Sequence, residues 1–344
     1  MMSSDAFIGG VEYYLPEKVL SNTQINSEHP EWSADKISAK TGIYNRHIAS
    51  EKEFSSDLGF RAAQKIFETN TISKSEIDYL VFCTQSPDYL VPTTACILQD
   101  KLGLSNHIGA IDINMGCSGY LYGLSYASGL VCSGQAKNVL LITSETYSKY
   151  INPLDKNNKT IFGDGASATI ISESGIGGLK GAIRNFSFYT DGSGFDKLIV
   201  RNSGVRNSNE PSLNIFDEEG NYIKNDSNLY MNGKAIFEFT SFKVPQLIDS
   251  FLSKNKITMQ SIDLFVFHQA NEYMMQFIRR RCKIAEEKFF IYLKDCGNTV
   301  SSSIPIALNE AMKQQRIKNG SKVLLVGFGV GLSIAVTLID YLDD

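Results

Sequence analysis

The stretch Ala110–Leu124, AIDINMGCSGYLYGL, decides the fold. An apolar run leads into Cys117 between two glycines, and a helical pattern follows at once. A strand that turns tightly into a helix is the repeating unit of α/β folds. The stretch Asp263–Phe277, DLFVFHQANEYMMQF, has the same plan around His268, although the two share too little sequence to count as a repeat. We therefore predict two α/β halves of similar design, residues 1–175 and 176–344.

Apolar runs and helical patterns alternate along the rest of the chain. The runs are apolar at nearly every position, which is typical of strands covered on both faces. We expect strands at Tyr79–Thr84, Ile108–Asn114, Val139–Thr143, Ala168–Ser172, Leu264–His268, Phe289–Leu293, Val323–Phe328 and Ile334–Tyr341, and helices at Tyr120–Cys132, Tyr273–Cys282 and Ile304–Gln315. The alternation predicts a layered α/β fold with mainly parallel sheets. The polar, poorly periodic stretch Tyr189–Met231 predicts a long excursion on the surface or over a cleft.

The charge balance limits the partners that the chain can bind. Its 344 residues carry a formal net charge of −4, with both signs spread along the sequence. This argues against binding nucleic acid or another polyanion through bulk charge. The only tight basic cluster is Arg279, Arg280 and Arg281. Such a run is either a solvated helix face or a docking patch for an acidic partner or a phosphate group.

The cysteine pattern and the termini indicate the compartment. Six cysteines, at positions 83, 96, 117, 132, 282 and 296, form no CxxC pair. HExxH and Walker motifs are also absent, so nothing indicates a metal ion or a nucleoside triphosphate. No run approaches the roughly 20 apolar residues that cross a bilayer, and the first residues lack the pattern of a secretion signal. We expect a cytoplasmic protein with reduced cysteines and no membrane contact.

Cys117 is the strongest candidate for a reactive side chain. A thiol at the start of a helix lies at the positive end of the helix dipole, which predicts a lowered thiol pKa and more thiolate at neutral pH. Gly116 and Gly119 leave room for a substrate carbonyl. The alternative is a buried structural cysteine, which is the more common fate of a cytosolic cysteine.

Three further segments carry candidate polar groups. His268 follows an apolar strand, at the strand end where open α/β sheets bind ligands, although a lone histidine is more often a core residue. Asn298 lies in a loop before a helix, where asparagine often serves a turn; its NH2 group can also bind an enolate oxygen. The turn Gly327–Gly331 joins two strands and can present backbone N–H groups to a substrate.

Together these segments resemble the β-ketoacyl-acyl carrier protein synthase III family of the thiolase superfamily. The resemblance covers nearly the whole chain, with the motifs in the family's order. They are Glu31-Trp32, Lys40-Thr41-Gly42-Ile43, Arg46-His47-Ile48, Pro92–Cys96, the Cys117 loop, Phe162-Gly163-Asp164-Gly165-Ala166, His268-Gln269-Ala270-Asn271, Gly297-Asn298-Thr299 and the Gly327–Gly331 turn. The resemblance implies a thiolase-like fold, with two pseudo-symmetric halves in α-β-α-β-α layers, and a homodimer.

The resemblance also implies a decarboxylative condensation. Cys117 would attack an acyl-CoA, with the oxyanion held by the backbone N–H groups of Cys117 and Val330. A malonyl thioester on acyl carrier protein would then lose CO2, and His268 and Asn298 would stabilise the enolate. The attack of this enolate on the acyl group gives a 3-oxoacyl thioester. We expect no cofactor, because the CoA thioester and the carrier protein are the substrates.

Other residues match family positions that contact substrate. Trp32 corresponds to the aromatic residue that stacks on the CoA adenine. Lys40 is also expected to bind CoA, Lys156 replaces a usual Arg beside the adenine, and Lys234 replaces an Asn that contacts CoA. Val91 matches the residue that crosses the dimer interface and limits the acyl pocket. Family members with an aromatic residue there favour short primers, so Val91 predicts a larger or branched primer.

Two departures from the family concern the partner and the substrate. Tyr273 stands where the family usually has an Arg that helps dock the carrier protein. Arg279 and Arg280, on the same predicted helix, would replace that Arg only in part. The turn GFGVGLSIA, residues 327–335, lacks the usual run of three glycines and the following Trp. These changes predict a specialised paralogue rather than the housekeeping initiator of fatty acid synthesis.

Four functions stay open on the sequence alone. The first is the ketosynthase described above, and the second is an acyltransferase of the same fold that moves the acyl group to an alcohol or amine. A non-catalytic subunit and a cysteine hydrolase are the others. Asn298 favours the first, because simple transfer needs no enolate stabiliser. Cys117 argues against an inactive subunit, and nothing obviously activates water for a hydrolase.

Overall fold

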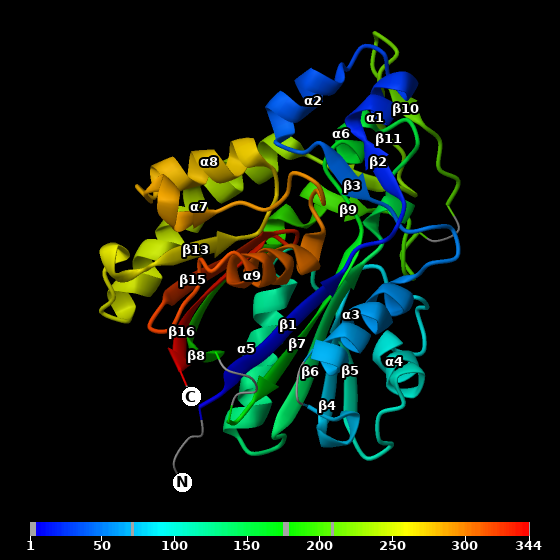
Figure 1. Cartoon of the computed structure of the whole chain (residues 1–344). Helices are drawn as coiled ribbons and strands as arrows, with labels where there is room; N and C mark the ends of the chain where they lie inside the picture. The colour runs from blue at the N-terminus through cyan, green and yellow to red at the C-terminus, as the bar shows by residue number, and fades with distance from the viewer. Residues whose placement is uncertain (1–4, 70–71, 175–178, 208–209, 344) are drawn as a thin grey trace.

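The computed structural model describes residues 5–69, 72–174, 179–207 and 210–343. Within these residues, ten strands form one continuous sheet (Figure 1). The strand order is β14-β13-β15-β16-β8-β1-β7-β6-β4-β5. The bounds are β1 (Phe7–Tyr14), β4 (Tyr79–Cys83), β5 (Gly109–Ile113), β6 (Asn138–Glu145), β7 (Gly165–Ser172), β8 (Leu179–Thr190), β13 (Leu264–Phe267), β14 (Phe289–Phe290), β15 (Lys322–Gly329) and β16 (Ser333–Asp343). Only two residue pairs join β1 to β8, namely Phe7 with Ala182 and Ile8 with Gly181. The sheet therefore consists of two groups of five strands with a narrow join.

The two groups have the same pattern of strand directions. β4 is parallel to β5 and β6, and β13 is parallel to β14 and β15. The other neighbours, including β6 with β7 and β15 with β16, are antiparallel. The expectation of mainly parallel sheets is therefore wrong: apolar runs indicate burial on both faces, and burial does not decide direction. The expected boundary at 175/176 lies outside the described residues and stays a prediction.

Six helices complete the layers. They are α3 (Ser55–Thr69), α4 (Thr94–Leu102), α5 (Gly119–Cys132), α7 (Gly233–Lys254), α8 (Glu272–Arg281) and α9 (Ser303–Lys313). α5 and α9 lie between the two groups of strands, while α3 and α4 cover one outer side and α7 and α8 the other (Figure 1). Three clusters of buried apolar side chains fill the spaces between the layers. This is the expected α-β-α-β-α arrangement.

The excursion is more ordered than its composition predicts. Tyr189 still belongs to β8, and the rest contains β9 (Leu198–Val200), β10 (Ile215–Phe216), β11 (Tyr222–Lys224) and β12 (Leu229–Met231). β9 pairs with β12, and β10 pairs with β11. The peripheral elements are β2 (Val19–Ser21), α1 (Asn22–Glu28), α2 (Ala34–Thr41), β3 (Asn45–His47) and α6 (Lys156–Lys159) (Figure 1). Residues of α6 and of the loop after α1 line a pocket together with Phe216 of β10 and Tyr222 of β11.

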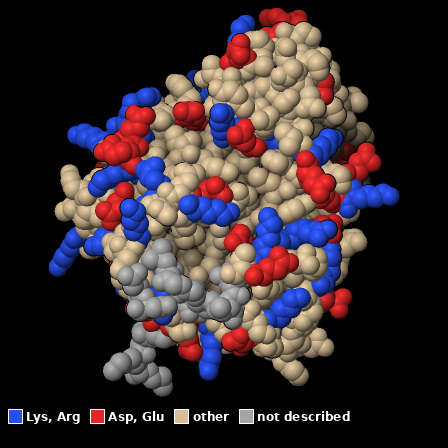
Figure 2. All heavy atoms as spheres, in the orientation of Figure 1, with Lys and Arg blue, Asp and Glu red and all other residues tan. Residues whose placement is uncertain are grey.

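The predicted elements are found with small shifts at their ends. Among these, the expected strand Phe289–Leu293 is shortened to Phe289–Phe290, and the expected strand Ala168–Ser172 is lengthened to Gly165–Ser172. Among the described residues, no helix is long and apolar enough to cross a membrane. Figure 2 shows acidic and basic side chains interspersed over one face of the molecule, without an extended field of one sign.

Candidate active site

Cys117 lies in a tightly packed loop between β5 and α5. Its side chain is buried, and α5 begins two residues later at Gly119. A Cβ on Gly116 would lie 2.4 Å from Gln85 Oε1 and 2.6 Å from Val330 Cγ1. A Cβ on Gly329 would lie 2.7 Å from Cys117 Cβ and 2.8 Å from Sγ. Glycine at both positions therefore lets the turn around Val330 pack directly against the cysteine.

The ionisation of Cys117 differs from the sequence-based expectation. Burial raises the pKa of the Cys117 thiol to about 12, and ionisation of the nearby Glu145 adds to the rise. Backbone hydrogen bonds from Val330 and from Cys117 itself oppose it. The expected fall of the thiol pKa is therefore wrong, because the cost of desolvating a thiolate outweighs the favourable backbone groups. A proton acceptor is needed before this thiol can act as a nucleophile.

His268 follows β13 and is almost completely buried. Burial lowers the pKa of His268 to about 3, against a smaller opposing effect of the nearby Val300 backbone. The imidazole is thus neutral at pH 7. Its Nδ1 lies 2.7 Å from Ser303 Oγ, and the ring meets Phe328 edge-on with centroids 5.5 Å apart. One ring nitrogen is therefore bonded to the protein, which leaves Nε2 for a substrate or for Cys117.

Asn298 is fixed through its backbone and its amide oxygen. Its N–H donates to Ile161 O at 2.9 Å, and its carbonyl accepts from Gly163 N–H at 3.0 Å. The side-chain Oδ1 accepts a 2.9 Å hydrogen bond from Val300 N–H. Because the oxygen is occupied, the NH2 group of Asn298 is the part of the amide that remains for a ligand.

These residues meet in one cavity of about 120 Å³. Cys117, His268, Asn298 and Val330 all line it, together with mostly apolar side chains from the excursion, α7 and α8. The family resemblance predicts one site for all four residues, and the structure brings them together. The cavity gives a substrate carbonyl simultaneous access to a thiol, an imidazole and a neutral amide. Within the described residues, no group of three or more His, Cys, Asp or Glu side chains is arranged to hold a metal ion.

A larger cavity adjoins the first. It has a volume of about 350 Å³ and shares Leu198 and Val330 with the catalytic cavity. Leu90 lines this cavity, whereas the neighbouring Val91 does not and is 83% exposed. Val91 therefore does not limit the pocket of its own chain, and its predicted action across a dimer interface remains a prediction.

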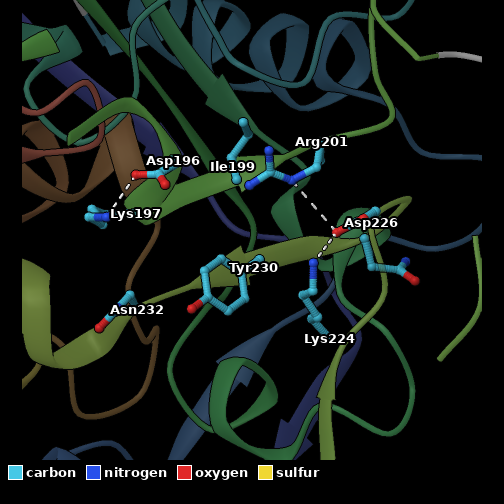
Figure 3. A pocket seen from close by; sticks show the side chains of 9 residues that line it. Asp196, Lys197, Ile199, Arg201, Lys224, Asp226, Tyr230 and Asn232 are labelled. Atoms are coloured by element: carbon cyan, nitrogen blue, oxygen red, sulfur yellow. Dashed lines mark hydrogen bonds and ion pairs between the residues drawn. The ribbon is translucent and has the colours of Figure 1, made fainter. Parts of the chain in front are cut away.

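The excursion forms part of the wall of the candidate catalytic cavity, which is the cavity lined by Cys117, His268 and Asn298. Side chains alternate between the two faces of a strand, and in the β9–β12 pair Leu198 and Met231 face the catalytic cavity. Neighbouring Ile199 and Tyr230 line a separate charged pocket of about 170 Å³ (Figure 3). The short sheet is thus a wall between two differently lined spaces.

The cations of the charged pocket are paired with carboxylates. Lys197 Nζ lies 2.9 Å from Asp196 Oδ1, and Lys224 Nζ lies 2.9 Å from Asp226 Oδ1 (Figure 3). Arg201 Nε approaches the same Asp226 oxygen at 3.8 Å. The nine residues that line this pocket include no cysteine or histidine. The pocket therefore offers charge pairing rather than nucleophilic chemistry.

Three of the four predicted CoA-binding residues lie together. Lys40 Nζ and Lys156 Nζ lie 5.2 Å and 5.7 Å from the centroid of the Trp32 ring. Lys156 also pairs with Glu31 at 2.9 Å. We call Trp32, Lys40 and Lys156 the Trp32 surface. Lys234 is separate: it lies at the start of α7, with its side chain 84% exposed and 3.9 Å from Glu238.

The basic cluster on α8 is only partly available to a partner. Arg279 donates to Gln276 Oε1 and Ile284 O and approaches Glu286 at 3.4 Å. Arg280 is exposed, and Arg281 lies over the Phe242 ring at 4.6 Å. Arg279 therefore has a structural role, which leaves Arg280 and Arg281 as the exposed cations of the cluster.

Sequence reasoning missed two buried polar residues beside the site, Glu145 and Ser303. Glu145 accepts hydrogen bonds from Ser301 Oγ, Ser86 Oγ and the Gln85 N–H group. Burial raises the pKa of Glu145 to about 8. In the sequence, the signal for Glu145 is an acidic residue soon after the apolar run Val139–Ile142, and Ser303 shows only the pattern of a serine at the start of a helix.

Comparison with known proteins agrees with this geometry. The family model for 3-oxoacyl-(acyl-carrier-protein) synthase III matches residues 111–192, and the model for its C-terminal part matches residues 252–341. The beta-ketoacyl-(acyl-carrier-protein) synthase III of Clostridium perfringens is 36% identical over 332 residues, which cover 96% of this chain and 97% of that protein. The chain belongs to the synthase III family.

Other synthase III proteins support the assignment. The relative from Chlamydia caviae is 38% identical over 93% of this chain and 92% of its own. A crystal structure of a 3-oxoacyl-(acyl-carrier-protein) synthase III has 43% identity and a TM-score of 0.92, covering 98% of this chain and 99% of its own. The synthase III structure from Pseudomonas aeruginosa has 28% identity and a TM-score of 0.83, covering 98% of each chain. The family and the thiolase-like fold expected from the sequence are confirmed.

Proposed function

We propose that this synthase III family member is an acyltransferase that condenses an acyl-CoA primer with malonyl-acyl carrier protein to give a 3-oxoacyl thioester. The observation that carries the proposal is the meeting of Cys117, His268 and Asn298 in one buried cavity beside the Val330 turn. Each of the three comes from a different loop, and each presents a different chemical group to the same space.

The first half-reaction forms an acyl-enzyme. Because burial keeps the Cys117 thiol protonated, its proton passes to the neutral His268 imidazole as the sulfur attacks the thioester carbonyl. The backbone N–H groups of Cys117 and Val330, which already act on the sulfur, hold the oxyanion. Collapse of this intermediate breaks the bond to CoA, and His268 passes the proton to the departing sulfur, so that CoA leaves as a thiol and the imidazole is neutral again.

The second half-reaction makes the carbon–carbon bond. The malonyl thioester oxygen lies against the Asn298 NH2 group and Nε2 of His268, which takes up one proton from solvent as negative charge develops on that oxygen. Both donors stabilise the enolate that remains after CO2 leaves. The enolate attacks the acyl carbonyl, the Cys117 thiolate departs, and His268 returns the proton. The mostly apolar lining favours this step, since a desolvated carboxylate is converted into neutral CO2.

The Trp32 surface and the α8 cluster are the proposed contacts of the two substrates. Trp32, Lys40 and Lys156 offer an aromatic face and two cations for the adenine and phosphates of CoA. Lys234 adds an exposed cation beside Gly233, which lines the catalytic cavity. Arg280 and Arg281 are the contacts proposed for the acidic carrier protein.

A homodimer would cover an exposed part of the first half. β5 is an edge strand of the sheet, with unpaired backbone groups along one side. Asp112 on β5 holds the start of α4 through Thr94 N–H and Ala95 N–H. The preceding loop exposes Tyr89, Leu90 and Val91 by 63%, 74% and 83%. Pairing of β5 with a second copy would satisfy the edge and cover this apolar loop.

Intact mass spectrometry tests the proposed reaction. Incubation with a series of acyl-CoAs is expected to give a covalent adduct in the wild type and none in Cys117→Ala. Addition of malonyl-acyl carrier protein should then release CO2 and discharge the adduct. Transfer of the acyl group without CO2 release would point to the alcohol or amine acyltransferase instead, and absence of any adduct would reject both.

A further inference from the structure

A strained residue lies between His268 and Asn298. Val300 is fully buried and has a φ of +53°, a left-handed conformation that β-branched residues rarely adopt. Its N–H donates to Asn298 Oδ1 at 2.9 Å, and its carbonyl accepts from Ser303 Oγ at 2.9 Å. One peptide turn thus holds the side chain of Asn298 directly and that of His268 through Ser303.

The hydrogen bonds of Ser303 are almost completely determined. Its hydroxyl donates to the Val300 carbonyl, and its oxygen accepts from Gln269 N–H at 3.4 Å. His268 Nδ1 lies 2.7 Å from the same oxygen. A serine hydroxyl has one proton and two acceptor sites. Because that proton is already bonded to Val300, the remaining site accepts a proton from Nδ1–H of His268.

We infer that Ser303 is a positioning residue that holds neutral His268 in the Nδ1–H form, with the unprotonated Nε2 directed into the catalytic cavity. This inference rests on the proposed function, since it matters only if His268 receives the Cys117 proton. The free lone pair on Nε2 is the acceptor that the buried thiol needs. A ring in the opposite form would place an N–H against Cys117 and would block the transfer.

The next serine in the chain provides a matched control. Ser302 is as buried as Ser303 and lies one residue earlier. Its hydroxyl bonds to Thr143 Oγ1 at 2.9 Å and to Gly165 O at 3.1 Å, on the side of β6 and β7. Ser302→Ala therefore removes a buried hydroxyl from the same turn without removing a partner of His268.

Single-turnover acylation distinguishes the two serines. Ser303→Ala is expected to slow formation of the acyl-Cys117 adduct by roughly 10- to 100-fold at saturating acyl-CoA, with little change in acyl-CoA affinity. Ser302→Ala should lose stability but keep the acylation rate within about threefold. Equal rates for the two variants would overturn the inference. The proposed function would still stand in that case, provided the wild type forms the adduct and releases CO2.

Nitrogen-15 NMR of histidine-labelled protein measures the ring form of wild-type His268 directly, without a measurement of activity. The chain has four histidines, and the His268 signals are identified by their loss in His268→Gln. Wild-type His268 is expected to show a protonated Nδ1 and an unprotonated Nε2 near pH 7. Ser303→Ala should shift both nitrogens toward averaged values. A protonated Nε2 in the resting wild type would contradict the inference.

Discussion

Two regions of the molecule hold the residues proposed to act on acyl-CoA. One region keeps its ionisable side chains neutral, whereas the other keeps them charged. In the catalytic cavity, burial raises the pKa of Cys117 to about 12 and lowers the pKa of His268 to about 3, so both side chains are neutral. At the Trp32 surface, Lys156 remains close to Glu31 and holds the pKa of that carboxyl below its usual value. The position of the reactive groups in the cavity thus depends on packing, whereas the proposed binding of CoA at the Trp32 surface depends on charges that salt can screen.

Gly329→Ala should have the largest effect, because it breaks the packing on which the cavity depends. The new Cβ would lie 2.7 Å from Cys117 Cβ and 2.8 Å from Sγ, at a φ of +154° that favours glycine. Displacement of the nucleophile is expected to reduce acylation about 100-fold or more. The rate of adduct formation by intact mass measures the effect.

Gly320→Ala is the matched control for this change. Gly320 also has a positive φ, of +78°, but a Cβ there would meet no atom within 4 Å. It should lose roughly 1–2 kcal/mol of stability from backbone strain and keep its acylation rate. If both alanine variants acylate equally fast, close packing at Cys117 is not what positions the nucleophile.

The same contrast explains how much the sequence predicted. Cys117, His268, Asn298 and Val330 lie in motifs with a family resemblance, and all four line the catalytic cavity. The thiol pKa was predicted in the wrong direction, because a helix start is visible in the sequence while the burial of the thiol depends on segments far away in the chain. Glu145 was missed for the same reason, because its burial and its hydrogen bond to Ser301 depend on segments far away in the chain.

Some errors came from local patterns that do not encode direction or contacts. The apolar strands predicted burial correctly but not their mixed directions. The composition of the excursion did not reveal that β9 and β12 form a wall of the cavity, because only alternate side chains of two short strands face it. Arg279 looked free for a partner until its hydrogen bonds to Gln276 and Ile284 were known.

Glu145→Gln tests whether burial controls ionisation beside the cavity. The carboxyl of Glu145 has a pKa of about 8 when folded and an ordinary value of 4.5. Between these values the folded protein binds the extra proton, so this group lowers the free energy of unfolding as pH rises from about 4.5 to 8. Glutamine does not titrate and removes that contribution.

Urea unfolding at several pH values between 5 and 8 measures the difference. The stability of Glu145→Gln relative to the wild type is expected to increase steadily over this range. Glu210→Gln, at an exposed position in the excursion, is the control and should follow the wild-type curve. Parallel curves for all three proteins would show that the carboxyl of Glu145 is not held protonated by its surroundings.

Lys156→Ala should have the smallest effect, because it concerns the exposed side of the comparison. Loss of a cation 5.7 Å from the Trp32 centroid is expected to raise the KM for acyl-CoA about 2- to 5-fold and leave kcat unchanged, since the contact is equal in the ground and transition states.

Lys101→Ala is a close control: Lys101 also pairs with a carboxylate, Asp57 at 2.5 Å, and lies 5.9 Å from the Phe60 ring. KM should rise only for Lys156→Ala, and the difference should shrink as salt is added. A fall in kcat, or a KM ratio that salt leaves unchanged, would mean that Lys156 acts on the chemistry or the packing rather than as a screened cation beside Trp32.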